Sequence, residues 1–191
     1  MKTISCKLDK RVPFLGSSSI SQESLSYILQ ILPKNKNILM IGSGKGSLFL
    51  SKFYNILSVE HDEEYINCHD IKYLYAPLVL SPENILWYDL EVIKKCLNKK
   101  YDMIIVDGPP GSTSDRIGFL MVLDFIKDLE NTILVIDDVQ RPKEMHLANS
   151  LKQQVERDFV IVESFTKNEN MTELFHFRPP KYKLTAFFEV A

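Results

Sequence analysis

Short apolar segments alternate with helical patterns through most of this chain of 191 residues. The segments 37–41, 101–106 and 132–136 are apolar almost throughout, whereas a half-buried strand would alternate apolar with polar residues. Continuous apolar strands that are separated by helices indicate a parallel sheet covered by helices on both faces. We therefore predict an α/β, doubly wound fold.

The periodicity predicts seven strands, of which the last two follow one another without a helical pattern between them. Those two strands should form an antiparallel hairpin at one edge of a mostly parallel sheet. The predicted strands are 37–41, 56–60, 84–88, 101–106, 132–136, 159–165 and 184–190, and the predicted helices are 21–32, 47–53, 63–76, 90–97, 115–129 and 143–157.

The length predicts a single domain, 1–191, with a core from residue 25 onward. Residues 1–24 are expected to form an N-terminal extension, which either covers the ligand pocket as a lid or pairs with a second subunit in a homodimer. Lys183, near the end of the chain, is interpreted as part of a solvated turn.

The composition narrows the classes of partner. The net charge is −2, so no basic field attracts nucleic acid, and no apolar stretch approaches the length of a membrane span. Cys6, Cys68 and Cys96 are scattered and form no CxxC pair, which favours a reducing compartment over a disulfide or zinc framework. We therefore expect a cytoplasmic protein that binds neither nucleic acid nor membrane.

A glycine-rich turn, Gly42–Gly46, directly follows the first predicted strand, and Glu60 ends the second. Glycines let the backbone approach a ligand closely because no Cβ intervenes. A carboxylate at the tip of the next strand can accept hydrogen bonds from both hydroxyls of a ribose. The two features in this order predict a nucleoside site, and the GxGxG spacing disfavours an NAD-dependent enzyme.

The predicted carboxyl ends of the strands carry more chemistry than the opposite ends. Ligands of such sheets bind beyond the carboxyl ends, near the switch in strand order. The residues concentrated there are Gly42–Gly46, Glu60, Asp89, the Asp107–Gly111 segment, Asp137 and Asp138.

These motifs resemble those of the class I S-adenosylmethionine-dependent methyltransferases, which have a Rossmann-like, seven-stranded sheet. The resemblance rests on Ile41–Gly46, Val59–Asp62, Ile105–Gly111 and Val135–Asp138 with Arg141. It implies that the chain binds S-adenosylmethionine and transfers its methyl group. Met40 departs from the pattern, since many members carry an acid at that position.

The resemblance also implies a role for individual residues toward S-adenosylmethionine. The glycine loop would back the methionine part, Glu60 would accept the ribose hydroxyls, and Asp89 would accept from the adenine amino group. The residues implied in cofactor binding are Gly42, Ser43, Gly44, Gly46, Glu60, His61, Asp89 and Asp107.

Asp107, Asp137 and Asp138 should converge at the tips of two neighbouring strands. Carboxylates this close disfavour full ionisation unless a cation joins them, and Mg²⁺ or another divalent cation fits such a set. Similarity to metal-dependent catechol-type O-methyltransferases implies the same arrangement. Alternatively, Asp138 only caps the next helix, and Arg116 and Arg141 either bind an anionic acceptor or form internal ion pairs.

The prediction is an S-adenosylmethionine-dependent methyltransferase that acts on a hydroxyl of a small molecule or glycan. Asp107, Asp138 and Arg116 are the predicted catalytic residues. The alternatives are a metal-independent N-methyltransferase and a noncatalytic nucleoside-binding module.

Overall fold

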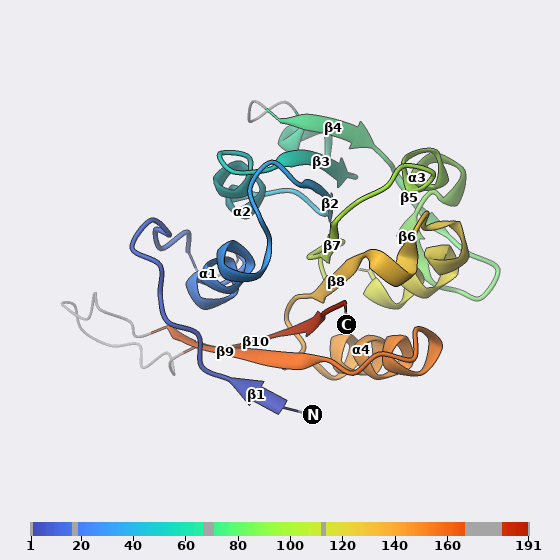
Figure 1. Ribbon diagram of the computed structural model, residues 1–191. Coiled ribbons are helices and arrows are strands. Elements are labelled where there is room, and N and C mark those ends of the chain that lie inside the picture. Colours follow the sequence, from blue (N-terminus) through green and yellow to red (C-terminus); the bar gives the residue numbers. More distant parts are fainter. Residues whose placement is uncertain (1, 17–18, 67–70, 112–113, 167–180, 191) are drawn as a thin grey trace, which may run out of the picture.

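The computed structural model describes residues 2–16, 19–66, 71–111, 114–166 and 181–190. Its centre is an eight-stranded sheet in the order β1-β9-β10-β8-β7-β2-β3-β4 (Figure 1). The strands are β1 (Lys2–Ile4), β2 (Asn37–Ile41), β3 (Asn55–Glu60), β4 (Lys72–Tyr75), β7 (Met103–Val106), β8 (Ile133–Ile136), β9 (Val160–Thr166) and β10 (Lys181–Phe188).

Strand β10 runs antiparallel to both of its neighbours, whereas the other pairs in this sheet are parallel. The predicted doubly wound α/β fold with an antiparallel C-terminal hairpin is therefore confirmed. The sheet has eight strands where seven were predicted: β4 joins it, the predicted strand 84–88 lies outside it, and β1, from the N-terminal extension, pairs in parallel with β9. Three residues are too few to show a strand period in the sequence.

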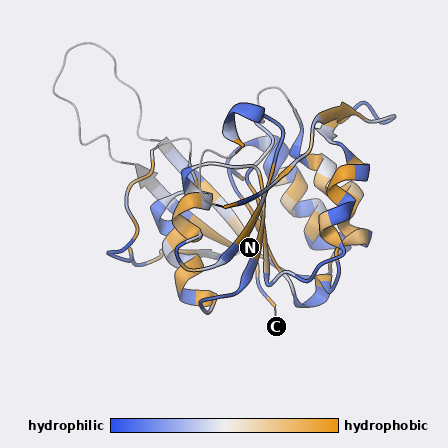
Figure 2. Ribbon diagram, turned by 90° about the horizontal axis from the view of Figure 1, so that it is seen from above, coloured by the Kyte–Doolittle hydropathy of each residue, from blue (hydrophilic) through white to orange (hydrophobic). Residues whose placement is uncertain are grey.

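Helices cover both faces of the sheet, so the two faces build separate cores (Figure 2). The strand residues alternate between them: Leu39 and Ile41 of β2 pack in one core, and Ile38 and Met40 in the other. The helical elements are α1 (Gln22–Ile31), α2 (Lys45–Leu50), α3 (Leu90–Leu97), α4 (Pro142–Gln154), and the 3₁₀ helices η1 (Glu63–Tyr65), η2 (Arg116–Phe125) and η3 (Leu129–Asn131).

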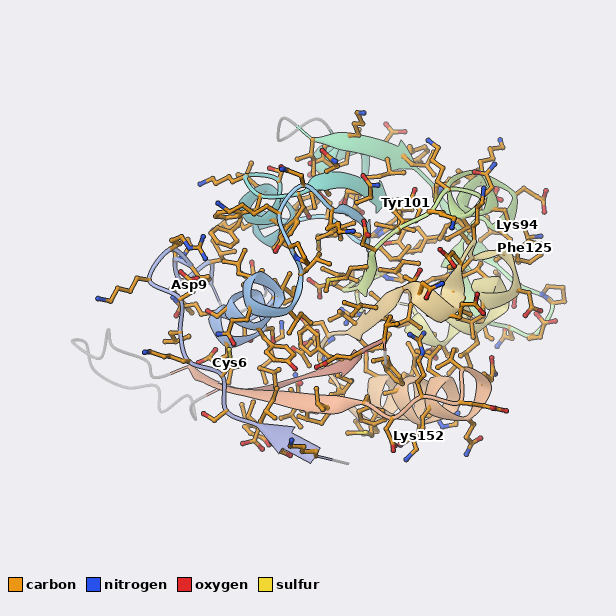
Figure 3. All side chains as sticks on the ribbon, viewed as in Figure 1. Cys6, Asp9, Lys94, Tyr101, Phe125 and Lys152 are labelled. Carbon is orange, nitrogen blue, oxygen red and sulfur yellow. The ribbon has the colours of Figure 1, made fainter. Side chains whose placement is uncertain are left out.

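Helices α1 and α2 contribute to the same core as Ile38, whereas α3, η2 and α4 contribute to the core of Leu39. On the outer surface, Lys94 of α3 lies over the ring of Phe125 in η2, 4.4 Å from its centroid (Figure 3). No helix in the described ranges is long and apolar enough to cross a membrane.

Between β3 and α3, the predicted helix 63–76 is wrong, and the predicted strand 84–88 exists in shorter form but outside the main sheet. The segment predicted as helix 63–76 contains η1 and strand β4, with residues 67–70 outside the described part. Segment 72–75 becomes a strand because β3 offers a free edge with which it pairs, from Leu57 opposite Lys72 onward. Residues 84–88 contain β6 (Leu86–Tyr88), which pairs only with β5 (Leu78–Leu80) in a separate small hairpin.

The other boundaries move by a few residues, as helix ends commonly do. The predicted helix 115–129 is largely the 3₁₀ helix η2. Helix α2 starts at residue 45 and ends at residue 50, whereas the prediction was 47–53. Ser21 caps α1, because its side chain accepts a hydrogen bond from Ser24 N, which places the start of this helix where the sequence predicts it.

Candidate functional site

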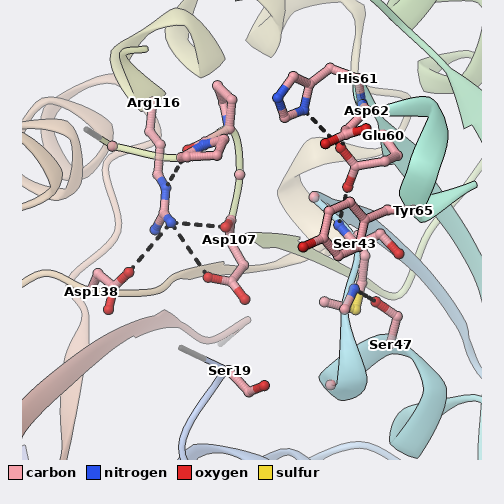
Figure 4. A pocket seen from close by; sticks show the side chains of 18 of the residues that line it. Ser19, Ser43, Ser47, Glu60, His61, Asp62, Tyr65, Asp107, Arg116 and Asp138 are labelled. Atoms are coloured by element: carbon pink, nitrogen blue, oxygen red, sulfur yellow. Dashed lines mark hydrogen bonds and ion pairs between the residues drawn. The ribbon is translucent and has the colours of Figure 1, made fainter. Parts of the chain in front are cut away.

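A cavity of about 890 Å³ lies at the carboxyl ends of β2, β3 and β7 (Figure 4). This volume is within the roughly 300–1,000 Å³ that small-molecule sites occupy. The cavity is lined by Ser19, Met40, Gly42, Ser43, Gly44, Lys45, Gly46, Ser47, Glu60, His61, Asp62, Tyr65, Tyr88, Asp107, Gly108, Pro109, Pro110, Gly111, Arg116, Asp138 and Arg141. The predicted cofactor-binding residues other than Asp89 are therefore brought together.

The glycine loop touches the loop after β7 through backbone atoms. Gly42 has φ +101°, and a Cβ there would lie 2.8 Å from the amide nitrogen of Gly108. Gly44 differs, because a Cβ built on it meets nothing within 4 Å. Gly42 thus lets two loops meet, whereas Gly44 leaves open space in the wall of the cavity.

Alanine at these two glycines should have opposite effects. Gly42→Ala places a Cβ against backbone at positive φ, so we expect a loss of several kcal/mol of stability. Gly44→Ala should leave the melting temperature within a few degrees of wild type but weaken any ligand that fills the space. Thermal melts with ligand calorimetry check both, and equal melting temperatures for the two variants would contradict this account.

Glu60 is buried in the cavity wall, with 4% of its surface exposed. Its Oε2 accepts a hydrogen bond from Ser43 N (2.9 Å), and its Oε1 accepts from the amides of His61 (2.7 Å) and Asp62 (3.1 Å). The His61 ring Nδ1 also lies 2.7 Å from Oε1, but its direction is unsuited to a hydrogen bond. Glu60 therefore holds the glycine loop in place through the amide of Ser43. Its Oε2 has one donor among the described residues, so it retains a lone pair that can accept a hydrogen bond from a ligand hydroxyl.

Asp89 lies outside the lining of this cavity. Its carboxylate caps α3, accepting hydrogen bonds from Glu91 N (2.8 Å) and Val92 N (3.3 Å). This position follows from the topology, because β6 belongs to the small hairpin and its end is not among the parallel strand tips of the main sheet. The structure thus gives Asp89 a capping role, and its contact with adenine stays a prediction.

The structure does bring Asp107, Asp137 and Asp138 together, with one oxygen of each within 4.8 Å of the others. Asp137 is fully buried, and the side chain of Asp107 is 19% exposed. Asp138 has φ 62°, and its Oδ1 accepts from Gln140 Nε2 (3.2 Å). This arrangement needs counter-charges, which the protein supplies from three side chains.

Arg116, buried to 4% exposure, is the first of these counter-charges. Its guanidinium donates to the carbonyl oxygens of Asp107 (2.8 Å), Asp137 (3.1 Å) and Pro109 (3.2 Å) and lies 3.4 Å from Asp138 Oδ2. Arg141, half exposed, lies 3.1 Å from the same oxygen. The sequence left open whether these arginines bind an anionic acceptor or form internal ion pairs. In the structure both form internal ion pairs with Asp138.

Lys183 is the counter-charge that the sequence did not reveal. Its Nζ lies 2.6 Å from Asp137 Oδ2 and 3.3 Å from Asp138 Oδ1, and it donates to the carbonyl oxygen of Ser19 (2.8 Å). The interpretation of Lys183 as part of a solvated turn is wrong. The available signal was its place in the alternation of β10, where Lys183 shares a face with Thr185 and Phe187.

The surroundings move the pKa values of Asp107 and Asp138, the two members of this cluster that line the cavity, in opposite directions. Burial, and then the charge of Asp137, raise the pKa of Asp107 well above its ordinary value. Burial also acts to raise the pKa of Asp138, but the charges of Lys183, Arg116 and Arg141 outweigh it and hold that pKa below its ordinary value. Asp107 is thus the carboxyl with the weakest counter-charge.

The three carboxyls do not fit the expected divalent-metal site. Asp137 Oδ2 has no well-directed hydrogen-bond donor, but Lys183 Nζ lies 2.6 Å away, so its partner is the lysine charge. Asp138 is in contact with Lys183, Arg116 and Arg141 together. A positively charged nitrogen of the protein therefore already lies beside two of the three expected ligands.

No family model and no curated protein sequence matches this chain. Solved structures do match its fold. A precorrin 8W decarboxylase from Methanobacterium thermoautotrophicum is 13% identical, with TM-score 0.61 over 96% of each chain. The C-terminal domain of precorrin-6Y C5,15-methyltransferase from Rhodobacter capsulatus is 10% identical, with TM-score 0.60 over 94% of this chain and 99% of that one.

The methyltransferase domain of METTL16 is 13% identical, with TM-score 0.55 over 88% of this chain and 67% of that one. The structural neighbours thus include S-adenosylmethionine-dependent methyltransferases. This chain has the class I S-adenosylmethionine-dependent methyltransferase fold. At these identities the likeness concerns the fold, and the reaction is a separate question.

Proposed function

We propose that this protein is an S-adenosylmethionine-dependent methyltransferase that methylates an oxygen of a small molecule or glycan. One observation carries the proposal: the glycine loop, Glu60 and Asp107 line a single cavity at the carboxyl edge of a class I methyltransferase sheet. Ligands of doubly wound sheets bind at this edge.

The lining suits the cofactor. The open space beside Gly44 leaves room along the backbone for the amino-acid part, and Glu60 Oε2 has capacity for a ribose hydroxyl. When bound, S-adenosylmethionine supplies an electrophilic methyl group. The chain's own part is to hold the two reactants in line and to remove water, since positioning accounts for much of such a rate enhancement.

Asp107 is the group proposed to accept the proton of the acceptor hydroxyl. It lines the cavity, and its raised pKa makes it a stronger base than an ordinary carboxylate once it is ionised. Arg116 fixes Asp107 by bonding its carbonyl oxygen. Asp138, although it lines the cavity, acts through its ion pairs with Arg116 and Lys183.

Calorimetry with S-adenosylmethionine, S-adenosylhomocysteine and NAD tests the cofactor. We expect the first two to bind and NAD not to bind. Binding of NAD alone would overturn the proposal. Binding of the first two with no turnover across a panel of hydroxyl and amine acceptors would favour the nucleoside-binding module, and turnover confined to amines would favour N-methylation.

Asp107→Asn should lower turnover by about 10²–10⁴-fold, the usual contribution of a general base. Asn keeps the shape of the side chain, so the melting temperature should not fall and S-adenosylhomocysteine should bind as before. The exposed Asp124→Asn is the matched control and should turn over at the wild-type rate. A fully active Asp107→Asn enzyme would remove Asp107 from the mechanism.

A further inference from the structure

Lys183 occupies an unusual position for a lysine. It is the third residue of β10 and has 7% of its surface exposed, and its ammonium contacts Asp137 and Asp138. Burying an ammonium is costly unless it is paired and hydrogen-bonded. Here both conditions hold, because the carboxylates supply the opposite charge and the Ser19 carbonyl accepts a hydrogen bond.

The partner of Lys183 is itself held in place from the other side. Thr185 Oγ1 donates to Asp137 Oδ1 (2.8 Å), and Ser24 Oγ donates to Thr185 Oγ1 (2.7 Å). Ser21, the cap of α1, donates to Ser24 Oγ (2.8 Å). One oxygen of Asp137 is therefore used by this hydroxyl chain, and the other lies 2.6 Å from the ammonium of Lys183.

One oxygen of Asp137 and one oxygen of Asp138 lie close to the ammonium. Magnesium ligands lie at about 2.0–2.1 Å and calcium ligands at about 2.3–2.6 Å from the ion. Lys183 Nζ lies 2.6 Å from Asp137 Oδ2 and 3.3 Å from Asp138 Oδ1. An ion bound to the same two oxygens would have to share their space with a positive nitrogen.

We propose that the ammonium of Lys183 is the resident cation of the acidic cluster, Asp107, Asp137 and Asp138, and takes the place that a divalent metal ion would otherwise fill. The same ammonium holds Ser19, which lines the cavity, against the end of the sheet. The protein thus neutralises its strand-tip carboxylates with its own side chains. This inference concerns the cluster alone and stands whether or not S-adenosylmethionine is the ligand.

The test is Lys183→Met, which removes the charge and keeps most of the chain length, in titrations with Ca²⁺ and Mg²⁺. Wild type should show neither binding heat nor a change in melting temperature up to about 5 mM, above the roughly 10⁻⁴–10⁻³ M at which weak calcium sites fill. The variant should melt lower without metal. With the ion at ten times its Kd, its melting temperature should rise by about 3–6 °C.

Two controls locate the effect. Lys36→Met removes a lysine from a surface ion pair with Asp102 and should gain no response to metal. Adding Asp138→Asn to Lys183→Met should abolish the gained response, because it removes one of the carboxylates. A Lys183→Met protein that folds but gains no metal response overturns the proposal.

The wild-type titration decides the question if Lys183→Met does not fold. Absence of Ca²⁺ and Mg²⁺ binding supports the proposal. One bound ion per chain, lost in the single variant Asp138→Asn, overturns it.

Discussion

Replacing Arg116 by methionine should destabilise the folded protein by about 3–5 kcal/mol, the usual penalty for removing one partner of a buried ion pair. Its guanidinium bonds three carbonyl oxygens and contacts Asp138, and all of these would lose a donor or a charge. Methionine fills most of the same volume, so the loss reflects charge and hydrogen bonding. Urea denaturation at neutral pH measures it.

Arg141→Met is the matched control, since Arg141 contacts the same Asp138 oxygen from a half-exposed position. Ion pairs with this exposure contribute about 0–1 kcal/mol. We therefore expect the midpoint of Arg141→Met to stay close to wild type. Equal losses for the two arginines would show that burial does not set the importance of Arg116.

Replacing Glu60 by alanine should weaken both S-adenosylmethionine and S-adenosylhomocysteine by about 1–3 kcal/mol, or roughly 5–150-fold, the cost of hydrogen bonds to a charged group. The variant should also be less stable, because three backbone amides lose their acceptor. Calorimetry gives the affinities, and melting curves report the loosened loop.

Glu60→Gln separates the two effects. Its remaining carbonyl oxygen can still accept from the amides of His61 and Asp62, so stability should recover in part while the contact to the ribose stays impaired. The exposed Glu63→Ala, three residues along, controls for the loss of negative charge near the cavity and should bind both ligands normally. Wild-type affinity in a folded Glu60→Ala protein would contradict the role assigned to Glu60.

The internal balance of charge bears on the reaction. Arg116 and Lys183 are occupied by carboxylates of the protein itself, and between Asp107 and Asp138 it is Asp107 that has the weaker counter-charge. A carboxylate that accepts a proton at this position favours a substrate with a hydroxyl group over an anionic substrate. The class I fold alone makes no such choice, because one fold can host different reactions.

The sequence by itself determined the parallel core and the edge that carries the cavity. Continuous apolar runs such as 103–106 and 133–136 have no polar face to expose, so they must lie inside a sheet covered on both sides. Gly42 and Glu60 follow such runs directly, and a residue next to a strand end is placed by that strand. Local pattern was sufficient here because the positions depend on neighbours in the chain.

Tertiary structure decided what depends on partners far away in the chain. Segment 72–75 is a strand because the edge of β3 pairs with it, and Asp89 caps a helix because β6 joins a separate hairpin. Lys183 reaches Asp137 across 46 residues of sequence (183 − 137), which no local pattern encodes. The positive charge of Lys183 that helps to neutralise the acidic cluster comes from the antiparallel strand β10. That strand lies between β8 and β9 only in the folded sheet.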